Sequence, residues 1–98
     1  MSSKTQEINA IENKYGLALF RMGLTHLVDV GIRHLTDENV DESIKQILAN
    51  GEADKANGVV TFMTAEFQCD ILRCAAELAK FSVCELFAYI KEHIVISN

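Results

Sequence analysis

The sequence predicts an all-α protein, and three observations lead to this prediction. The 98 residues contain no proline and only five glycines, a composition unsuited to a turn-rich β-sandwich or β-barrel. Apolar residues between positions 62 and 90 recur at alternating spacings of three and four, the period of helix-on-helix packing. Polar residues between positions 21 and 33 recur every fourth position. We therefore expect one domain, residues 1–98, with two long helices and one short helix in a bundle.

The first long helix is expected over residues 3–34. Ser3 followed by Gln6 has the spacing of a capping box. Apolar residues occupy most of the circumference of this helix, and its narrow polar ribbon is Arg21, Thr25, Asp29 and Arg33. Gly16 and Gly23 lie seven residues apart and so on nearly one line of the helix. Because each interior glycine costs about 1 kcal/mol relative to alanine, we interpret the pair as a site of close helix approach. A kink near Gly23 is the alternative.

The short helix is expected over residues 40–49, before a flexible connection at residues 50–58. Asn39 is followed three residues later by Glu42, which is typical of a helix start. The pair Asn50-Gly51 suits a helix end. A second pair, Asn57-Gly58, closes the connection, because asparagine and glycine tolerate positive φ angles.

The second long helix is expected over residues 58–93. Its apolar seam continues from position 62 to position 90 with helical spacing. The start is ambiguous, since residues 59–63 are rich in strand-forming side chains and a short strand there is the alternative.

Homodimerisation is expected to complete the bundle. A helix from residue 61 to residue 93 would be about 50 Å long at 1.5 Å per residue, whereas a compact domain of this size has a radius of gyration near 13 Å. Symmetric dimers are the commonest soluble oligomers. The residues expected at the dimer interface are Gly16, Gly23, Leu72, Ala76, Ala79, Val83, Leu86 and Ile90.

The cysteines and histidines do not form a recognisable chemical motif. Cys69, Cys74 and Cys84 point in different directions or lie far apart on a helix, and no pair has the spacing of a zinc site. Cys69 is expected in the core, and Cys84 near the polar ribbon is the best candidate for a reactive thiol. His26 is expected to be a buried, hydrogen-bonded histidine. We therefore expect no metal and no cofactor.

Charge and hydropathy limit which partners the chain can bind and where in the cell we expect it. The formal net charge is −5, so the chain has no strong basic footprint for nucleic acid or an anionic membrane. The first fourteen residues lack the apolar core of a secretory signal, and charges interrupt the apolar stretch at residues 15–30. The odd number of cysteines suits reduced thiols. The expected location is the cytoplasm.

The expected function is binding rather than catalysis. A small, acidic, helical homo-oligomer without a catalytic motif suits a protein that docks on another macromolecule and modulates or inhibits it. Immunity-like, antitoxin-like, viral or phage-inhibitor-like and chaperone-like roles are the candidates. Asp37, Glu38, Asp41 and Glu42 are candidate contacts for a basic protein partner. The simpler explanation of these acids is compensation of the helix dipole and solubility.

Two other functions stay open. A small molecule could be held in a pocket between helices, with Tyr15, Arg21, His26 and Arg33 as its polar contacts. A weaker alternative is an enzyme whose site is assembled across the dimer from Cys84 or His26.

Overall fold

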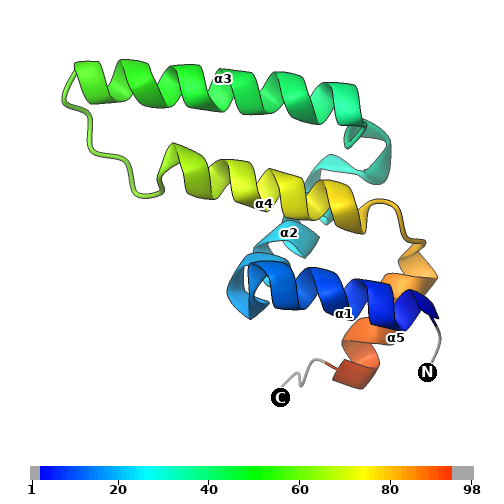
Figure 1. Cartoon of the computed structure of the whole chain (residues 1–98). Helices are drawn as coiled ribbons and strands as arrows, with labels where there is room; N and C mark the ends of the chain where they lie inside the picture. Colours follow the sequence, from blue (N-terminus) through cyan, green and yellow to red (C-terminus); the bar gives the residue numbers. More distant parts are fainter. Residues whose placement is uncertain (1–2, 94–98) are drawn as a thin grey trace.

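The computed structural model describes residues 3–93, which form five α-helices and one short 3-10 helix, without a strand (Figure 1). The all-α prediction is confirmed, but the prediction of three helices is wrong because both long helices are broken. The elements are α1 (Ser3–Tyr15), α2 (Leu17–Val30), η1 (Ile32–His34), α3 (Asp37–Ala56), α4 (Ala65–Leu78) and α5 (Val83–His93).

Two glycines divide the expected helix at residues 3–34. Gly16 has φ +91° and ψ 157°, and Gly31 has φ +89° and ψ 146°. This region of backbone space is essentially open only to glycine. Gly16 therefore separates α1 from α2 instead of lying inside one helix, and Gly31 ends α2 before η1.

Gly23 lies inside α2 and allows it to approach α4 closely. A Cβ atom added at Gly23 would lie 2.9 Å from the Cys74 Sγ atom and 3.3 Å from the Ala75 backbone nitrogen. The close-approach interpretation is thus confirmed at Gly23. The neighbouring helix is α4 of the same chain.

The expected short helix at residues 40–49 is longer at both ends. Thr36 caps it, with its Oγ1 atom accepting a hydrogen bond from the Asn39 backbone N–H at 3.2 Å. The helix continues through Gly51 and ends at the second Asn-Gly pair, where Gly58 has φ +70°. The N–H groups of Gly58 and of the next residue bond back to the last turn, at 3.2 and 2.9 Å, as in a Schellman motif. Most of the expected flexible connection at residues 50–58 is therefore helical.

The expected helix at residues 58–93 is also divided. Residues 59–63 form neither helix nor strand, and Thr64 caps α4 by accepting a hydrogen bond from the Phe67 N–H. After α4, residues 79–82 turn the chain. The Ser82 Oγ atom accepts from the Glu85 N–H at 3.1 Å, and a Glu85 carboxylate oxygen accepts from the Ser82 N–H at 3.0 Å. This capping box starts α5. The 50 Å rod that motivated the dimer prediction does not exist.

Helix α4 lies at the centre of the fold and packs against α1, α2 and α3. Helices α3 and α4 form an antiparallel hairpin, with α1, α2 and α5 gathered on the other side of α4 (Figure 1). The largest fully buried side chains are those of Ile8, Phe20, Cys69, Cys74, Leu78 and Tyr89. The molecule measures 49 × 31 × 21 Å, with a radius of gyration of 14.9 Å. None of the helices in residues 3–93 is both long and apolar enough to span a membrane.

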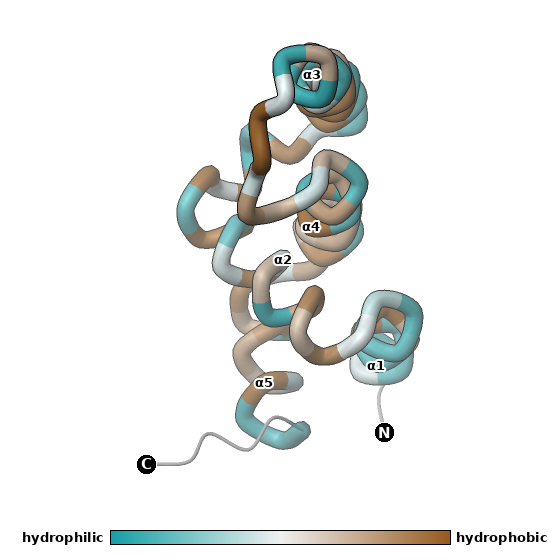
Figure 2. Tube along the Cα trace, turned by 90° about the vertical axis from the view of Figure 1, so that its left-hand side faces the viewer, coloured by the Kyte–Doolittle hydropathy of each residue, from teal (hydrophilic) through white to brown (hydrophobic). Residues whose placement is uncertain are grey.

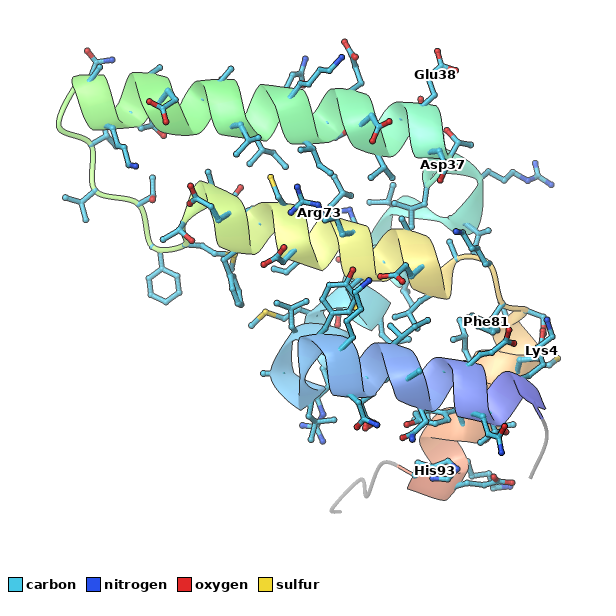
Figure 3. All side chains as sticks on the ribbon, in the orientation of Figure 1. Lys4, Asp37, Glu38, Arg73, Phe81 and His93 are labelled. Atoms are coloured by element: carbon cyan, nitrogen blue, oxygen red, sulfur yellow. The ribbon has the colours of Figure 1, made fainter. Side chains whose placement is uncertain are left out.

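Tyr89 anchors α5 on α1. Its hydroxyl oxygen lies 3.0 Å from the Asn9 Oδ1 atom and 3.0 Å from the Glu12 Oε1 atom. Its ring packs edge-on against Phe20 of α2, with 5.9 Å between the centroids. At the other end of α1, the Lys4 ammonium lies 5.6 Å from the centroid of the Phe81 ring (Figure 3). One face of α5 is thus packed against α1 and α2.

Candidate functional site

An apolar groove of about 600 Å³ lies between α2, the turn that follows it, and α5. Its volume falls within the range of ligand-binding clefts. We call it the apolar groove. It is lined by Leu24, Leu27, Val28, Val30, Gly31, Ile32, Arg33, His34, Val83, Leu86, Phe87 and Ile90.

The groove exists because α5 packs mainly on α1 and leaves its other face without cover. Phe87 is 70% exposed and Val28, on the opposite wall, is 82% exposed. Val83 is more than half exposed beside them. Burying one such side chain fully is worth about 1.5–3 kcal/mol. Because monomeric proteins rarely expose large apolar patches, this groove is the leading candidate for a binding site.

The lining of the apolar groove carries little charge. Arg33 is the single aspartate, glutamate, lysine or arginine among the described residues that line it. Gly31 turns the chain out of α2, and Ile32 and Arg33, which follow it, line the groove. The groove can therefore accept an apolar segment that carries a negative charge.

A second exposed apolar feature is the 59–62 loop, between α3 and α4. Val60 is 95% exposed and Phe62 is completely exposed. Figure 2 shows this hydrophobic stretch of chain where it leaves α3. Sequence reasoning placed Phe62 in the apolar seam of a helix, whereas the Gly58 turn and the Thr64 cap place it in a loop.

A third feature is a cleft of about 470 Å³ between α3, α4 and the end of α2. We call it the amide-rich cleft, because Asn39, Gln46, Asn50 and Gln68 line it above an apolar floor that includes Ile71 and Leu72. Asn39 donates its amide to the His34 carbonyl at 3.3 Å, and Gln68 donates to the Met63 carbonyl at 3.1 Å. No aspartate, glutamate, lysine or arginine is found among the described residues that line it.

The four residues expected to hold a small molecule do not meet. Tyr15 donates a hydrogen bond to Glu77, and Lys14 lies 3.2 Å from the same carboxylate. Burial and this contact raise the pKa of the Tyr15 hydroxyl well above its usual range. Arg21 is exposed on α2 and Arg33 lines the apolar groove. His26 is half-buried and lines the amide-rich cleft, whereas the sequence suggested a core position.

Seven of the eight residues expected at a dimer interface are divided between the interior and the apolar groove. Val83, Leu86 and Ile90 line the groove, although Leu86 is itself buried. Leu72 is buried beneath the amide-rich cleft, and Gly23 faces α4. The two alanines of this set, Ala76 and Ala79, are half-buried against the core, and Gly16 forms the turn between α1 and α2.

The four acidic residues expected to contact a basic partner lie together on the first turns of α3. Asp37, Glu38, Asp41 and Glu42 are all exposed. Asp37 and Glu38 lie at the start of the helix (Figure 3), where a carboxylate also compensates the helix dipole. This surface is separate from the apolar groove.

The three cysteines have different environments. Cys69 and Cys74 are buried, as expected for Cys69, and Cys84 is exposed on α5. Burial raises the pKa of the Cys74 thiol to about 12. Within residues 3–93, no three histidine, cysteine, aspartate or glutamate side chains are grouped so that they could hold a metal ion.

Comparison of the chain with protein-family models, with curated proteins and with solved structures gives no match. The candidate site therefore depends on geometry alone. Sequence reasoning missed Val28 and Phe87, the most exposed walls of the apolar groove. The signal that could have revealed Phe87 is Ser82 with Glu85, whose capping-box spacing starts a new helix and changes which face is covered.

Proposed function

We propose that this chain is a non-enzymatic protein-binding module, and that the apolar groove is the surface with which it binds. The observation that carries this proposal is the exposure of Val28, Val83 and Phe87 around one groove in a chain this small. Residues of this kind become stabilising when a partner removes them from water.

The dimensions of the groove favour an apolar segment of a protein as its occupant. The groove wall on α5 runs from Val83 to Ile90, which is eight residues and about 10 Å of helix. That length accepts two or three apolar anchors of an amphipathic helix or of a short loop. We propose homo-oligomerisation as well. Its contact surface would be the apolar groove, and not the apolar seam of one long helix.

The acidic start of α3 offers a second surface for a basic macromolecule. Because it lies outside the apolar groove, both surfaces can be occupied at once. We propose a cytoplasmic role in which the chain docks on another protein and modulates or inhibits it. An immunity-like, antitoxin-like, phage-inhibitor-like or chaperone-like role would suit such a module.

The test is selection of peptides from a random displayed library against the purified protein. We expect the selected peptides to carry apolar residues with helical spacing, and to bind the Phe87→Ser variant about 30-fold more weakly, since loss of a central aromatic contact costs about 2 kcal/mol. The matched control is Leu17→Ser, because Leu17 is an exposed apolar residue of α2 that does not line the groove. Peptides that bind Phe87→Ser and wild type equally would contradict the proposal.

A second candidate function is the binding of an uncharged polar small molecule in the amide-rich cleft. The observation that favours it is a cleft with four amide side chains over an apolar floor and no aspartate, glutamate, lysine or arginine among the described residues that line it. Amides offer paired donors and acceptors to a neutral ligand. Native mass spectrometry of freshly purified protein should then show a bound adduct that is lost in a Gln68→Leu variant. An adduct-free spectrum would count against this candidate.

A further inference from the structure

We propose that the occupant of the apolar groove is a second copy of this chain, which inserts Val60 and Phe62 of its 59–62 loop. This inference rests on the proposed function, because it names the partner of the same groove. The sequence led us to expect a dimer in which the same apolar helix face of each copy forms the interface. Here the contact joins two different surfaces, the 59–62 loop of one copy and the apolar groove of another.

The 59–62 loop has the form of an insertable segment. Its first end is fixed by the Schellman motif, in which the Val59 N–H bonds to the Asp54 carbonyl at 2.9 Å. Its second end is fixed by the Thr64 cap of α4, at 3.2 Å. Since both ends are held, only the short stretch of backbone between them must be ordered when the loop binds. Val60 and Phe62 are almost or completely exposed, so each gains most of its possible burial on binding.

The loop cannot fill the groove of its own chain. Figure 1 places the 59–62 loop at the far end of the α3–α4 hairpin, and α5 at the opposite end of the molecule. The fourteen residues of α4 lie between them, which is about 21 Å of helix. An exposed aromatic residue and an exposed apolar groove in one chain can therefore meet only between two copies.

Charge agrees with this pairing. Glu66, in the first turn of α4, is exposed and lies four residues after Phe62. Arg33 lines the groove. When the loop of one copy enters the groove of another, an acidic residue beside the loop approaches a basic residue beside the groove. Such complementarity at the rim fixes the orientation of the contact more than its strength.

Because loop and groove are different surfaces, each contact is heterologous. Two copies close into a dimer if each inserts its loop into the other; otherwise successive copies add to form larger assemblies. Both forms share one requirement: every contact uses Phe62 of one copy and Phe87 of the next. The test depends only on this requirement.

The experiment is sedimentation analysis of wild type, Phe62→Ser, Phe87→Ser and the Leu17→Ser control. We expect wild type and the control to exceed the 10.9 kDa monomer mass at micromolar concentration. Each of the other two variants should need at least about 30-fold more protein to associate, because one contact loses about 2 kcal/mol at its aromatic anchor and a closed dimer loses this anchor twice. All substituted side chains are exposed, so circular dichroism should show unchanged helix content.

Mixing the two deficient variants is the decisive step. Phe62→Ser keeps an intact groove and Phe87→Ser keeps an intact loop, so an equimolar mixture should regain one contact per pair and exceed the monomer mass. A mixture that stays monomeric overturns the inference. The inference is also overturned if the Phe62→Ser variant associates like wild type, because α5 would then contact a surface other than the 59–62 loop.

Failure of this inference is distinguishable from failure of the proposed function. The Phe62→Ser variant has an unaltered groove, so its binding of the selected peptides tests the groove without competition from the loop. A wild-type chain that is monomeric but binds those peptides through Phe87 overturns the second-copy inference and leaves the proposed function standing.

Discussion

Replacement of Gly23 by alanine tests how closely α2 and α4 pack. The added Cβ would lie 2.9 Å from the Cys74 Sγ atom and 3.2 Å from its Cβ atom, and Cys74 is fully buried. Such overpacking costs about 1–3 kcal/mol. Alanine also favours the helix over glycine by about 1 kcal/mol. We expect a net loss of about 1 kcal/mol in the free energy of unfolding, and a melting temperature lower by about 4–8 °C.

A double-mutant cycle isolates the contact. Cys74→Ala removes the Sγ atom that lies nearest to the new methyl group, at a cost of about 1 kcal/mol for the small cavity. In the double variant the two losses should not add, because the methyl group occupies space that the sulfur atom leaves. We expect a favourable coupling of about 1 kcal/mol, measured by urea denaturation.

Gly16→Ala is the matched control for this cycle. Nothing lies within 4 Å of a Cβ atom added there, so its cost comes only from the backbone, which has φ +91°. Gly16→Ala should therefore destabilise the protein without any coupling to Cys74→Ala. The reasoning is refuted if Gly23→Ala is more stable than wild type, or if its effect simply adds to that of Cys74→Ala.

Labelling and titration test three other features. The native protein should show one thiol that reacts quickly with Ellman's reagent, that of exposed Cys84, and three thiols in denaturant; two fast native thiols would contradict the burial of the others. The absorbance of tyrosinate should show that Tyr89 ionises with a pKa of about 12, because burial and Glu12 disfavour the charged form. This raised pKa contributes stability below the ordinary value of 10.0 that is lost as the pH rises towards 12, and normal ionisation near pH 10 would refute it. The pKa of Glu85 lies below its usual range because of hydrogen bonds to Ser82, so the cap stabilises α5 above the unfolded-state pKa and loses this effect as acid protonates Glu85. The melting-temperature difference between wild type and Glu85→Ala should shrink under acid, and a constant difference would exclude this role.

The all-helical fold could be predicted because local sequence patterns specify helices. Caps, four-residue polar spacing and the lack of proline act over a few residues and need no tertiary contact. The burial of Cys69 and the exposure of Cys84 also follow from helix faces, and the structure confirms both. The breaks in the two long helices were harder to predict, because a glycine costs only about 1 kcal/mol inside a helix and so does not by itself end one.

The groove could not be predicted, because a helical face shows that it is apolar but not which neighbour covers it. The seam through Leu72, Val83 and Leu86 keeps its spacing across the turn at residues 79–82, so one continuous helix and two packed helices share the same pattern. Tyr89 decided the outcome by binding α1, which turned Phe87 away from the core. The sequence by itself determined that the chain is helical and which residues make apolar helix faces, but not where each helix begins and ends. Only tertiary packing decided which of those faces stayed in water, since burial depends on residues far apart in the chain.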